Sequence, residues 1–464
     1  MRLRHVARVL FVGLLVASAF VIASGYLSAD TSDGDRPTFD APPREGITVI
    51  ATDSNTWLGE SSEGPRARAE LVALAPNGSA LYYNDSHTRY WDVDPVENER
   101  RTVMYVAADH LSESECDAST VCTRNAVERV NLSTGEVTRL YARITPGKHS
   151  TRWHDVDRLD DHRLVVADIA RDRVFVVNTT TQIVEWSWDA QSDFTTASGG
   201  EYPDDWTHIN DVEVLENGTI VVSVRNQDQA VFLDRETGMI EDMTLGADDR
   251  HETLHEQHNP DYIPEENGGP AVVVGDSENN RVVEYQREGG EWERTWVWYD
   301  ERTQWPRDAD RLPNGNTLIT DSNGNRVLEV NEAGEVVWSV DIAFPYESER
   351  LGTGDESTDG PSAAEAGLES RRGGGPAEDT AVAATDRTHL AAAFGGAWSV
   401  VQDLLPGRMG NAVMYVSPIW MSGPELMALA TLVVVLLVWL LAEAYWSGWS
   451  ASVRNPVSIT RRGR

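Results

Sequence analysis

A pattern of short apolar strands and polar motifs recurs through the middle of the chain with a period of roughly fifty residues. Each copy opens with a polar motif, continues with a run of β-branched residues, and leads into a further strand. The copies begin at His154, Asn210, His258 and Arg307, and three of them lead on to a strand that carries tryptophan. Repeats of this length that hold several short strands are typical of β-propeller blades.

The chain between residues 47 and 345 has room for six four-stranded blades of about fifty residues each. We therefore predict an all-β fold, a six-bladed β-propeller, in which four blades are evident and two near the N-terminus are inferred. A β-sandwich of repeated hairpins is the alternative, but it does not explain the repeat period. Equivalent positions of propeller blades converge on one central channel, so His154, Asn210, His258 and Arg307 are expected to line it.

Both ends of the chain are apolar and flanked by arginine. Residues 1–28 begin with arginines and continue as an apolar run, which predicts an N-terminal transmembrane helix or signal anchor and leaves cleavage open. Residues 424–447 predict a C-terminal transmembrane helix, and residues 448–464 form a basic tail. Arginine at both ends predicts cytoplasmic termini, which places the propeller on the extracellular side of the cell membrane.

The remaining segments are assigned from their composition. Residues 29–46 form a polar linker with three prolines, and residues 47–350 form the propeller domain. Residues 351–387 are rich in Gly, Ala, Ser and acidic residues, which predicts a disordered linker. Residues 388–423 form a juxtamembrane segment in which we expect a short amphipathic helix.

The 464-residue chain carries 75 acidic and 39 basic residues, a formal net charge of −36 at pH 7. It lacks the basic footprint of nucleic-acid-binding proteins, so no nucleic-acid partner is expected. Lys148 is the only lysine in the sequence, and so acidic and lysine-poor a surface predicts a halophilic protein. High net charge also favours disorder, but the 16 tryptophans and the regular strands argue against disorder in the middle of the chain.

The two cysteines, Cys116 and Cys122, lie close together in the sequence. Two cysteines cannot supply a four-cysteine metal site. If the domain lies outside the membrane, a local disulfide between them is expected, and closing so small a loop stabilises a fold only modestly.

The stretch from residue 206 to residue 258 concentrates donors that suit a bulky anion. It contains His208, His251, His255, His258, Asn210 and Arg225. Several of these follow or precede a predicted strand, and neutral or cationic donors at strand ends are what such an anion needs. Any single histidine among them could instead be an ordinary loop residue.

Four short motifs occur in one order along the repeats. They are Trp153-His154-Asp155, Trp206-Thr207-His208-Ile209-Asn210, Ser223-Val224-Arg225-Asn226-Gln227 and Gln257-His258. In order and spacing they resemble the arylsulfotransferase family, in particular its haloarchaeal membrane-anchored members. The resemblance covers roughly residues 47–346. It implies a six-bladed propeller that moves a sulfuryl group from an aryl sulfate to a phenol through a sulfohistidine, without a nucleotide donor or other cofactor.

Carried over position by position, the resemblance makes His258 the nucleophile and places His154, His208, Asn210 and Arg225 around the sulfuryl group. Neutral imidazole is a competent nucleophile near pH 7. Guanidinium and amide groups can donate hydrogen bonds to the sulfuryl oxygens, so Arg225 is expected to be catalytic and Asn210 to bind substrate. The repeat column adds Arg307 as a second substrate-binding residue. No metal is required by this chemistry.

Three other interpretations stay open. His154, His208 and His258 could bind zinc, although no carboxylate or cysteine obviously completes a ligand set. The propeller could bind a ligand at the cell surface without catalysis, because fold alone does not fix function. It could also hydrolyse sulfate or phosphate esters with the same histidines. The partners expected from the leading interpretation are a small aryl sulfate, a phenol and the membrane.

Overall fold

The computed structural model describes residues 2–28, 41–53, 69–96, 98–147, 151–373, 389–402, 404–405 and 407–447. The chain forms two compact units. The smaller comprises residues 1–31, 386–403 and 420–464, and the larger comprises residues 32–385 and 404–419. Residues 29–40 of the predicted linker, residues 374–387 of the predicted disordered linker, and the predicted basic tail lie outside the described residues.

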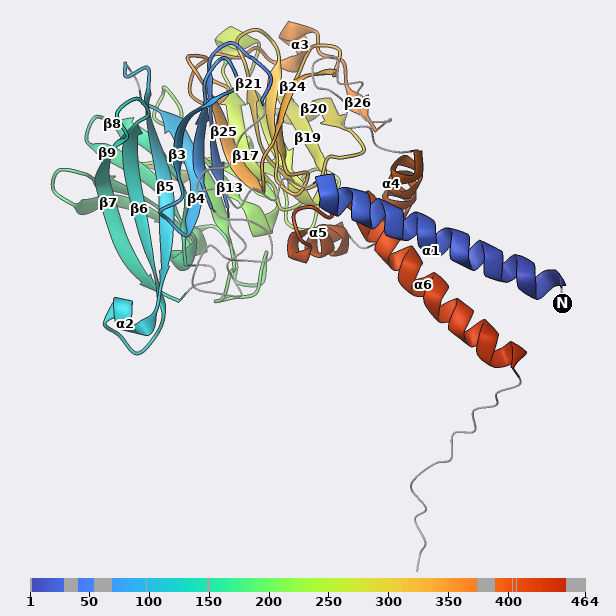
Figure 1. The fold of residues 1–464 in the computed structure, drawn as a ribbon. Helices are drawn as coiled ribbons and strands as arrows, with labels where there is room; N and C mark the ends of the chain where they lie inside the picture. The colour runs from blue at the N-terminus through green and yellow to red at the C-terminus, as the bar shows by residue number, and fades with distance from the viewer. Residues whose placement is uncertain are drawn as a thin grey trace, which may run out of the picture. The chain divides into compact units, whose positions relative to one another are not determined.

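The described residues of the larger unit form six β-sheets, and several of their strands are labelled in Figure 1. In pairing order, the first three sheets are β25 (Pro345–Leu351), β1 (Ile47–Thr52), β2 (Leu71–Leu74) and β3 (Ala80–Asn84); β4 (Arg89–Pro95), β5 (Thr102–Leu111), β6 (Cys122–Asn131) and β7 (Glu136–Pro146); and β8 (Trp153–Asp160), β9 (Arg163–Asp168), β10 (Arg173–Asn178) and β11 (Ile183–Asp189).

The other three sheets follow the same order along the chain. They are β12 (Ile209–Val214), β13 (Ile220–Val224), β14 (Gln229–Asp234) and β15 (Gly238–Met239), with β16 (Leu245–Gly246) beside β14; β17 (His258–Ile263), β18 (Ala271–Asp276), β19 (Arg281–Glu288), β20 (Glu291–Tyr299) and β26 (Arg371–Arg372); and β21 (Pro306–Arg311), β22 (Thr317–Asp321), β23 (Arg326–Val330) and β24 (Val336–Asp341). The pairing of β20 with β26 is parallel, and the other pairings are antiparallel.

One strand of each sheet takes part in a closed ring around the axis. In this ring β25, β4, β8, β12, β17 and β21 each contact the next, and β21 contacts β25. The ring closes because β25, at the end of the propeller, pairs with β1 at its beginning. The prediction of an all-β, six-bladed propeller is confirmed.

The hydrophobic core lies between neighbouring blades. One cluster joins Val165 of β9 to Val222 of β13, and each blade contributes to two such interfaces. Because a middle strand is covered on both faces, its sequence reads as a continuous apolar run, and all of β18 is buried. The tryptophans of the outer strands connect blades: Nε1 of Trp186 donates to the carbonyl of Arg235 in the next blade at 2.9 Å.

Three blades contain the same ion pair between their second and third strands. It joins Asp168 to Arg173 at 3.0 Å, Asp276 to Arg281 at 2.6 Å, and Asp321 to Arg326 at 2.8 Å. The intervening turn ends in a residue with positive φ, which is Asp172, Asn280 or Asn325. Asp and Asn tolerate this left-handed conformation better than other side chains, which explains why the repeat carries them there.

Part of the segment predicted to be disordered is folded onto the propeller. Residues 351–373 include α3 (Ala363–Ala366) and β26. Ser357 is buried and donates to Asp261 at 2.7 Å, and the Ala363 amide donates to Glu284 at 2.8 Å. The prediction is therefore wrong for this part, because its small polar residues satisfy buried carboxylates that would otherwise lack donors.

A short helix, α2 (Glu113–Cys116), lies in the connection from β5 to β6. Ser112 caps its first turn, and Glu115 returns a hydrogen bond to the Ser112 amide. Cys116 and Cys122 form a disulfide, with Cα atoms 6.2 Å apart.

The smaller unit consists of α1 (Arg2–Ser28), α4 (His389–Gln402) and α6 (Gly423–Trp446). By length and composition, Leu3–Leu27 and Gly423–Trp446 could each cross a membrane, which suggests membrane anchoring. Arg8 of α1 and Glu443 of α6 form a bidentate ion pair at 2.6 and 2.7 Å. A further helix, α5 (Gly407–Val416), belongs to the propeller unit.

Candidate active site

Each of the six strands around the axis, here called the innermost strands, has an irregular register near its beginning. In β17 the skipped residue is Asn259, directly after His258. Such bulges re-aim side chains. Six residues at or directly beside these irregularities align with one another in the repeat and are here called the site ring: Trp91, His154, Asn210, His258, Arg307 and Tyr346. The ring centroid of His154 lies 4.6 Å from that of Trp91 and 5.5 Å from that of Tyr346, and Tyr346 lies 6.0 Å from His258. Residues from different blades thus converge on the axis.

A second set, here called the rim ring, lies two residues before the site ring on each blade. Its members are Arg89, Arg152, His208, Glu256, Trp305 and Phe344. His208, Glu256, Trp305 and Phe344 have φ values of 49°, 46°, 55° and 50°. Positive φ is strained for residues other than glycine, and such strain clusters at functional sites. The predicted site residue His208 therefore belongs to the rim of the channel.

The backbone and Ser277 fix the orientation of the His258 imidazole. Nδ1 lies 3.2 Å from the carbonyl oxygen of Glu256 and 2.8 Å from Oγ of Ser277. Ser277 donates its own proton to the carbonyl of Pro306 at 2.7 Å, so both neighbours of Nδ1 are acceptors. Nδ1 must therefore carry the proton, and Nε2 carries the lone pair. Nε2 has no hydrogen bond within the described part of the chain.

Electrostatics keep this imidazole neutral. Burial lowers the pKa of His258 well below its usual value, and the positive charges of Arg307 and Arg225 lower it further. Burial is also the main reason why the pKa values of His154 and His208 are lowered. A buried neutral imidazole with a free lone pair is a nucleophile or a metal ligand.

His154, Tyr346 and His208 form a connected group beside His258. The Tyr346 hydroxyl lies 3.1 Å from Nδ1 of His154, and the His154 and His208 rings are 5.1 Å apart. Nε2 of His154 is buried and has no hydrogen bond among the described residues. Nδ1 of His208 pairs with the partly exposed carboxylate of Asp205, which links the buried group to solvent.

Arg225 opens the turn η3 (Arg225–Gln227), directly after β13. Its Nη2 pairs with Glu256 at 2.6 Å, while its Nε is buried and makes no hydrogen bond to any described residue. Although burial opposes the charge, the carboxylates of Glu256 and Asp205 raise the pKa of Arg225, so the guanidinium stays ionised. Its unused donor is available for an anion.

Arg307 is enclosed by aromatic rings. Its guanidinium carbon lies 4.6 Å from the ring centre of Trp305, 4.9 Å from that of Phe344 and 4.5 Å from that of Tyr346. Its nearest carboxylate is Asp53, at 3.5 Å. Within the described structure, Nε and Nη1 make no hydrogen bond. Aromatic faces hold the cation in place without using its N–H donors.

The remaining predicted residues divide into two groups. Nδ2 of Asn210 donates to the carbonyl of Gln257 at 3.1 Å, next to His258, so the amide contributes to positioning β17. His251 and His255 stack on each other at 3.8 Å and are not members of the site ring. They fit the interpretation of ordinary loop histidines.

Helix α5 reaches the same end of the channel. Arg408 pairs with Glu256, and Asn411 donates to Glu278 at 2.9 Å. The ring of Tyr415 lies 5.7 Å from Trp305 and 5.3 Å from Phe344, two members of the rim ring. For residues 388–423 the sequence predicted a juxtamembrane segment with a short amphipathic helix, and no motif in it pointed to the site.

Sequence reasoning also missed Trp91, Tyr346, Arg89 and Arg152. Arg89 pairs with Asp53 at 3.0 Å, and the guanidinium of Arg152 lies 5.3 Å from the Trp91 ring centre. The only sign of these residues in the sequence is their place in the repeat, because each belongs either to the site ring or to the rim ring.

Residues 142–254 match the family model described as Arylsulfotransferase (ASST), which supports the arylsulfotransferase family and a sulfotransferase enzyme. The matched segment contains His154, His208, Asn210 and Arg225, and ends before His258. No curated protein matches the chain.

Solved structures with similar folds are remote. The periplasmic gluconolactonase PpgL of Pseudomonas aeruginosa has 12% identity and a TM-score of 0.41, and the match covers 67% of this chain and 99% of that one. A protein from Lactobacillus plantarum has 8% identity and a TM-score of 0.42, with coverages of 66% and 98%. Virginiamycin B lyase from Staphylococcus aureus has 10% identity and a TM-score of 0.34, with coverages of 54% and 69%. Likenesses this weak carry no argument about this chain.

Proposed function

We propose that the protein is an aryl sulfotransferase that moves a sulfuryl group from a phenolic sulfate ester to a phenol through a sulfohistidine at His258. The observation that carries the proposal is the orientation of this imidazole. Its Nδ1 proton is held by Ser277 and the Glu256 carbonyl, so the Nε2 lone pair is free for attack. A nucleotide donor is not needed, because the group passes directly from ester to histidine.

In the first step, Nε2 of His258 attacks the sulfur of the aryl sulfate. The N–S bond forms while the S–O bond to the aryl group breaks, and the electron pair leaves with the phenolate oxygen. The proton for that oxygen comes from solvent, because burial lowers the pKa of His208 and Asp205 holds its Nδ1 proton. In the second step a different phenol reacts: neutral His208 accepts the phenol proton, the phenol oxygen attacks sulfur, and the N–S bond breaks with its electron pair returning to Nε2 of His258.

The cations around His258 stabilise the charge that spreads over the sulfuryl oxygens. Arg225 and Arg307 each retain N–H groups without hydrogen bonds to described residues. If the Tyr346 hydroxyl donates to Nδ1 of His154, then Nε2 of His154 carries a proton and provides a third donor. Preorganised donors in a buried site stabilise such charge far better than water does.

We further propose that both apolar helices span the cell membrane and that the propeller lies outside, in a halophilic, haloarchaeal-type arrangement. The arginine-rich chain ends favour cytoplasmic termini. The Cys116–Cys122 disulfide supports an oxidising location for the propeller. Protease treatment of intact cells should remove the propeller, and full protection of peptides that contain Trp206 would contradict this topology.

The test of function uses the full-length protein in detergent and molar KCl, with a chromogenic aryl sulfate and a phenol acceptor. We expect phenol release that depends on the acceptor, and a sulfated acceptor as product. His258→Ala should abolish both, whereas His255→Ala, a nearby histidine outside the site ring, should retain most of the activity. Release of inorganic sulfate independent of acceptor would make the protein a hydrolase, and a folded His258→Ala variant that transfers normally would remove the nucleophile assignment.

A further inference from the structure

Below the site ring, the innermost strands carry a ring of acidic and amide side chains, here called the carboxylate ring. Its members are Asp92, Asp155, Asp211, Asn259, Asp308 and Glu347. Each follows a member of the site ring directly, and all six are at most 4% exposed. Two residues farther along the strands lies another acidic set: Asp94, Asp157, Glu213, Asp261, Asp310 and Glu349.

In several members of the carboxylate ring, one of the two carboxylate oxygens accepts a hydrogen bond from a backbone amide. Asp92 accepts the Val156 amide at 2.9 Å, and Glu347 accepts the Val93 amide at 2.8 Å. Asp308 likewise accepts the amide of Ser348 at 3.1 Å. Each bond connects neighbouring innermost strands, and it satisfies backbone donors that no strand ladder satisfies. This accounts for only one of the two oxygens in Asp92 and Asp308.

Other oxygens of these carboxylates accept no such hydrogen bond within the described structure. Oδ1 of Asp92, Oδ2 of Asp211 and Oδ1 of Asp308 are buried without a hydrogen bond to described residues. In Asp310 both oxygens are in this state, although the side chain is only 1% exposed. An ionised carboxylate accepts but cannot donate, and leaving it buried without a partner is costly. Burial raises the pKa values of these carboxyls, so the missing donor is either a proton shared between neighbouring carboxyls or a cation.

The geometry of three members fits a cation. One oxygen from each of Asp92, Asp155 and Glu347 lies within 4.8 Å of the others. Atoms this close lie within about 2.8 Å of a common centre, near the ~2.3–2.6 Å that Ca²⁺ takes to oxygen. We propose that the central channel, below the histidines, binds a divalent cation of the Ca²⁺ type through Asp92, Asp155 and Glu347.

The ligand chemistry selects the class of ion. All three groups supply hard oxygen atoms and none supplies nitrogen or sulfur, which disfavours zinc and copper. Three carboxylates exceed the charge of one divalent cation, and water would complete the six to eight ligands that Ca²⁺ takes. The site differs from the histidine cluster that the sequence left open for zinc.

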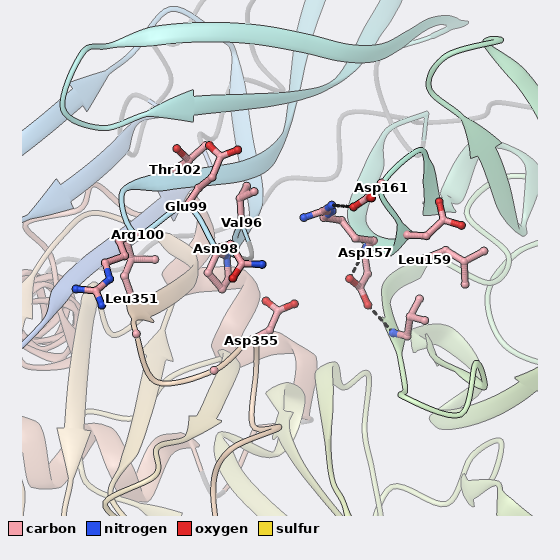
Figure 2. Close-up of a pocket in the computed structure, with 16 residues that line it drawn as sticks. Val96, Asn98, Glu99, Arg100, Thr102, Asp157, Leu159, Asp161, Leu351 and Asp355 are labelled. Atoms are coloured by element: carbon pink, nitrogen blue, oxygen red, sulfur yellow. Dashed lines mark hydrogen bonds and ion pairs between the residues drawn. The ribbon is translucent and has the colours of Figure 1, made fainter.

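Acidic groups also gather at the opposite ends of the innermost strands. A pocket of about 510 Å³ lies there, lined by Asp157 and Asp355 from different parts of the propeller unit (Figure 2). Beyond it, Asp94, Glu347 and Glu356 form a second group whose oxygens lie within 4.8 Å of one another. Negative charge at this end of the propeller attracts cations.

A bound cation would also position the reacting groups. Its ligands Asp92, Asp155 and Glu347 are covalent neighbours of Trp91, His154 and Tyr346 in the site ring. One ion bound to three innermost strands would hold these strands in place, and the strands in turn position Trp91, His154 and Tyr346. The proposed ion takes no part in sulfuryl transfer, and its presence does not depend on the proposed function.

The experiment is a titration of the full-length, chelator-treated protein with Tb³⁺ in molar KCl, which screens surface carboxylates. Trp91 adjoins Asp92 and should sensitise Tb³⁺ luminescence in the channel. We expect one saturable site per chain, displacement by Ca²⁺, and a higher melting temperature with Ca²⁺. Asp92→Asn should weaken binding by about tenfold or more. Asp168→Asn, an equally buried carboxylate in an outer ion pair, should not.

Glu347→Gln provides a second variant if Asp92→Asn does not fold. Absence of a saturable site in the wild-type protein would overturn the proposal and show that the carboxylates share protons instead. Binding that neither substitution weakens would overturn it as well. A saturable site in a protein without transferase activity would separate this proposal from the proposed function.

Discussion

The orientation of His258 depends on Ser277, and Ser277→Ala tests that dependence. The substitution removes the acceptor at 2.8 Å from Nδ1 and leaves the weaker contact with the Glu256 carbonyl at 3.2 Å. It also removes the donor to the Pro306 carbonyl at 2.7 Å. Two separate losses are therefore expected, one in catalysis and one in stability.

The catalytic loss follows from one hydrogen bond. A net value of about 0.5–1.5 kcal/mol corresponds to a decrease in kcat/KM of roughly two- to twelvefold. The unsatisfied Pro306 carbonyl should lower the free energy of unfolding by about 1–3 kcal/mol. The rate effect should appear in kcat, because the imidazole tautomer matters for the chemical step rather than for binding.

A matched control exists in the next blade. Ser322 occupies the equivalent position and donates to the Pro345 carbonyl at 2.6 Å, but no histidine depends on it. Ser322→Ala should lose a similar amount of stability and keep the wild-type kcat for chromogenic phenol release. Equal kinetic effects of the two substitutions, or no change in kcat for Ser277→Ala, would refute the assigned tautomer.

Three further outcomes follow from the structure. Arg225→Ala should lower kcat by about 10²–10³-fold while leaving sulfuryl labelling of the protein detectable, and a double variant with His258→Ala should be little worse than His258→Ala alone. Although burial opposes the charge, hydrogen bonds to Asp109 and Glu128 raise the pKa of His87 to about 9. The stability that this pairing provides should be complete below about pH 6.5 and lost as the pH rises to about 9, and thermal melts of His87→Gln should lack that loss. Dilution from molar KCl into low salt should unfold the propeller, because 75 acidic residues then repel one another unscreened, and full stability there would contradict a halophilic surface.

The repeat made much of the fold and part of the site predictable. His154, Asn210, His258 and Arg307 occupy one position of successive copies, so a single alignment identified four of the six members of the site ring. Trp91 escaped although Trp91-Asp92-Val93-Asp94 matches His154-Asp155-Val156-Asp157 at three positions, because β5, the strand that follows, leads into α2 and not into the short turn of the other repeats. Tyr346 escaped because the second strand of the repeat does not follow it in the sequence. The Tyr346 blade is also built from both ends of the propeller, since β25 pairs with β1.

Other features could not be read from sequence for physical reasons. Ser277 is an ordinary residue until the fold places it beside His258 and Pro306. Residues 351–373 have the composition of a flexible tether, yet their polar groups satisfy buried carboxylates of the propeller. Helix α5 lies in a segment whose composition predicted a short amphipathic helix near the membrane and gave no sign of a contact with the site. In each case the deciding partner is remote in sequence, so local patterns carry no signal.

The most direct test of the central claim is to locate the sulfuryl group. The full-length protein is incubated in molar KCl with an aryl sulfate and no acceptor, quenched at alkaline pH, and mapped by peptide mass spectrometry. The structure predicts one sulfuryl group on the imidazole of His258, and its disappearance when a phenol is added before the quench. A sulfuryl group on His154 or His208 instead, or transfer to the phenol without any labelled histidine, would contradict the claim.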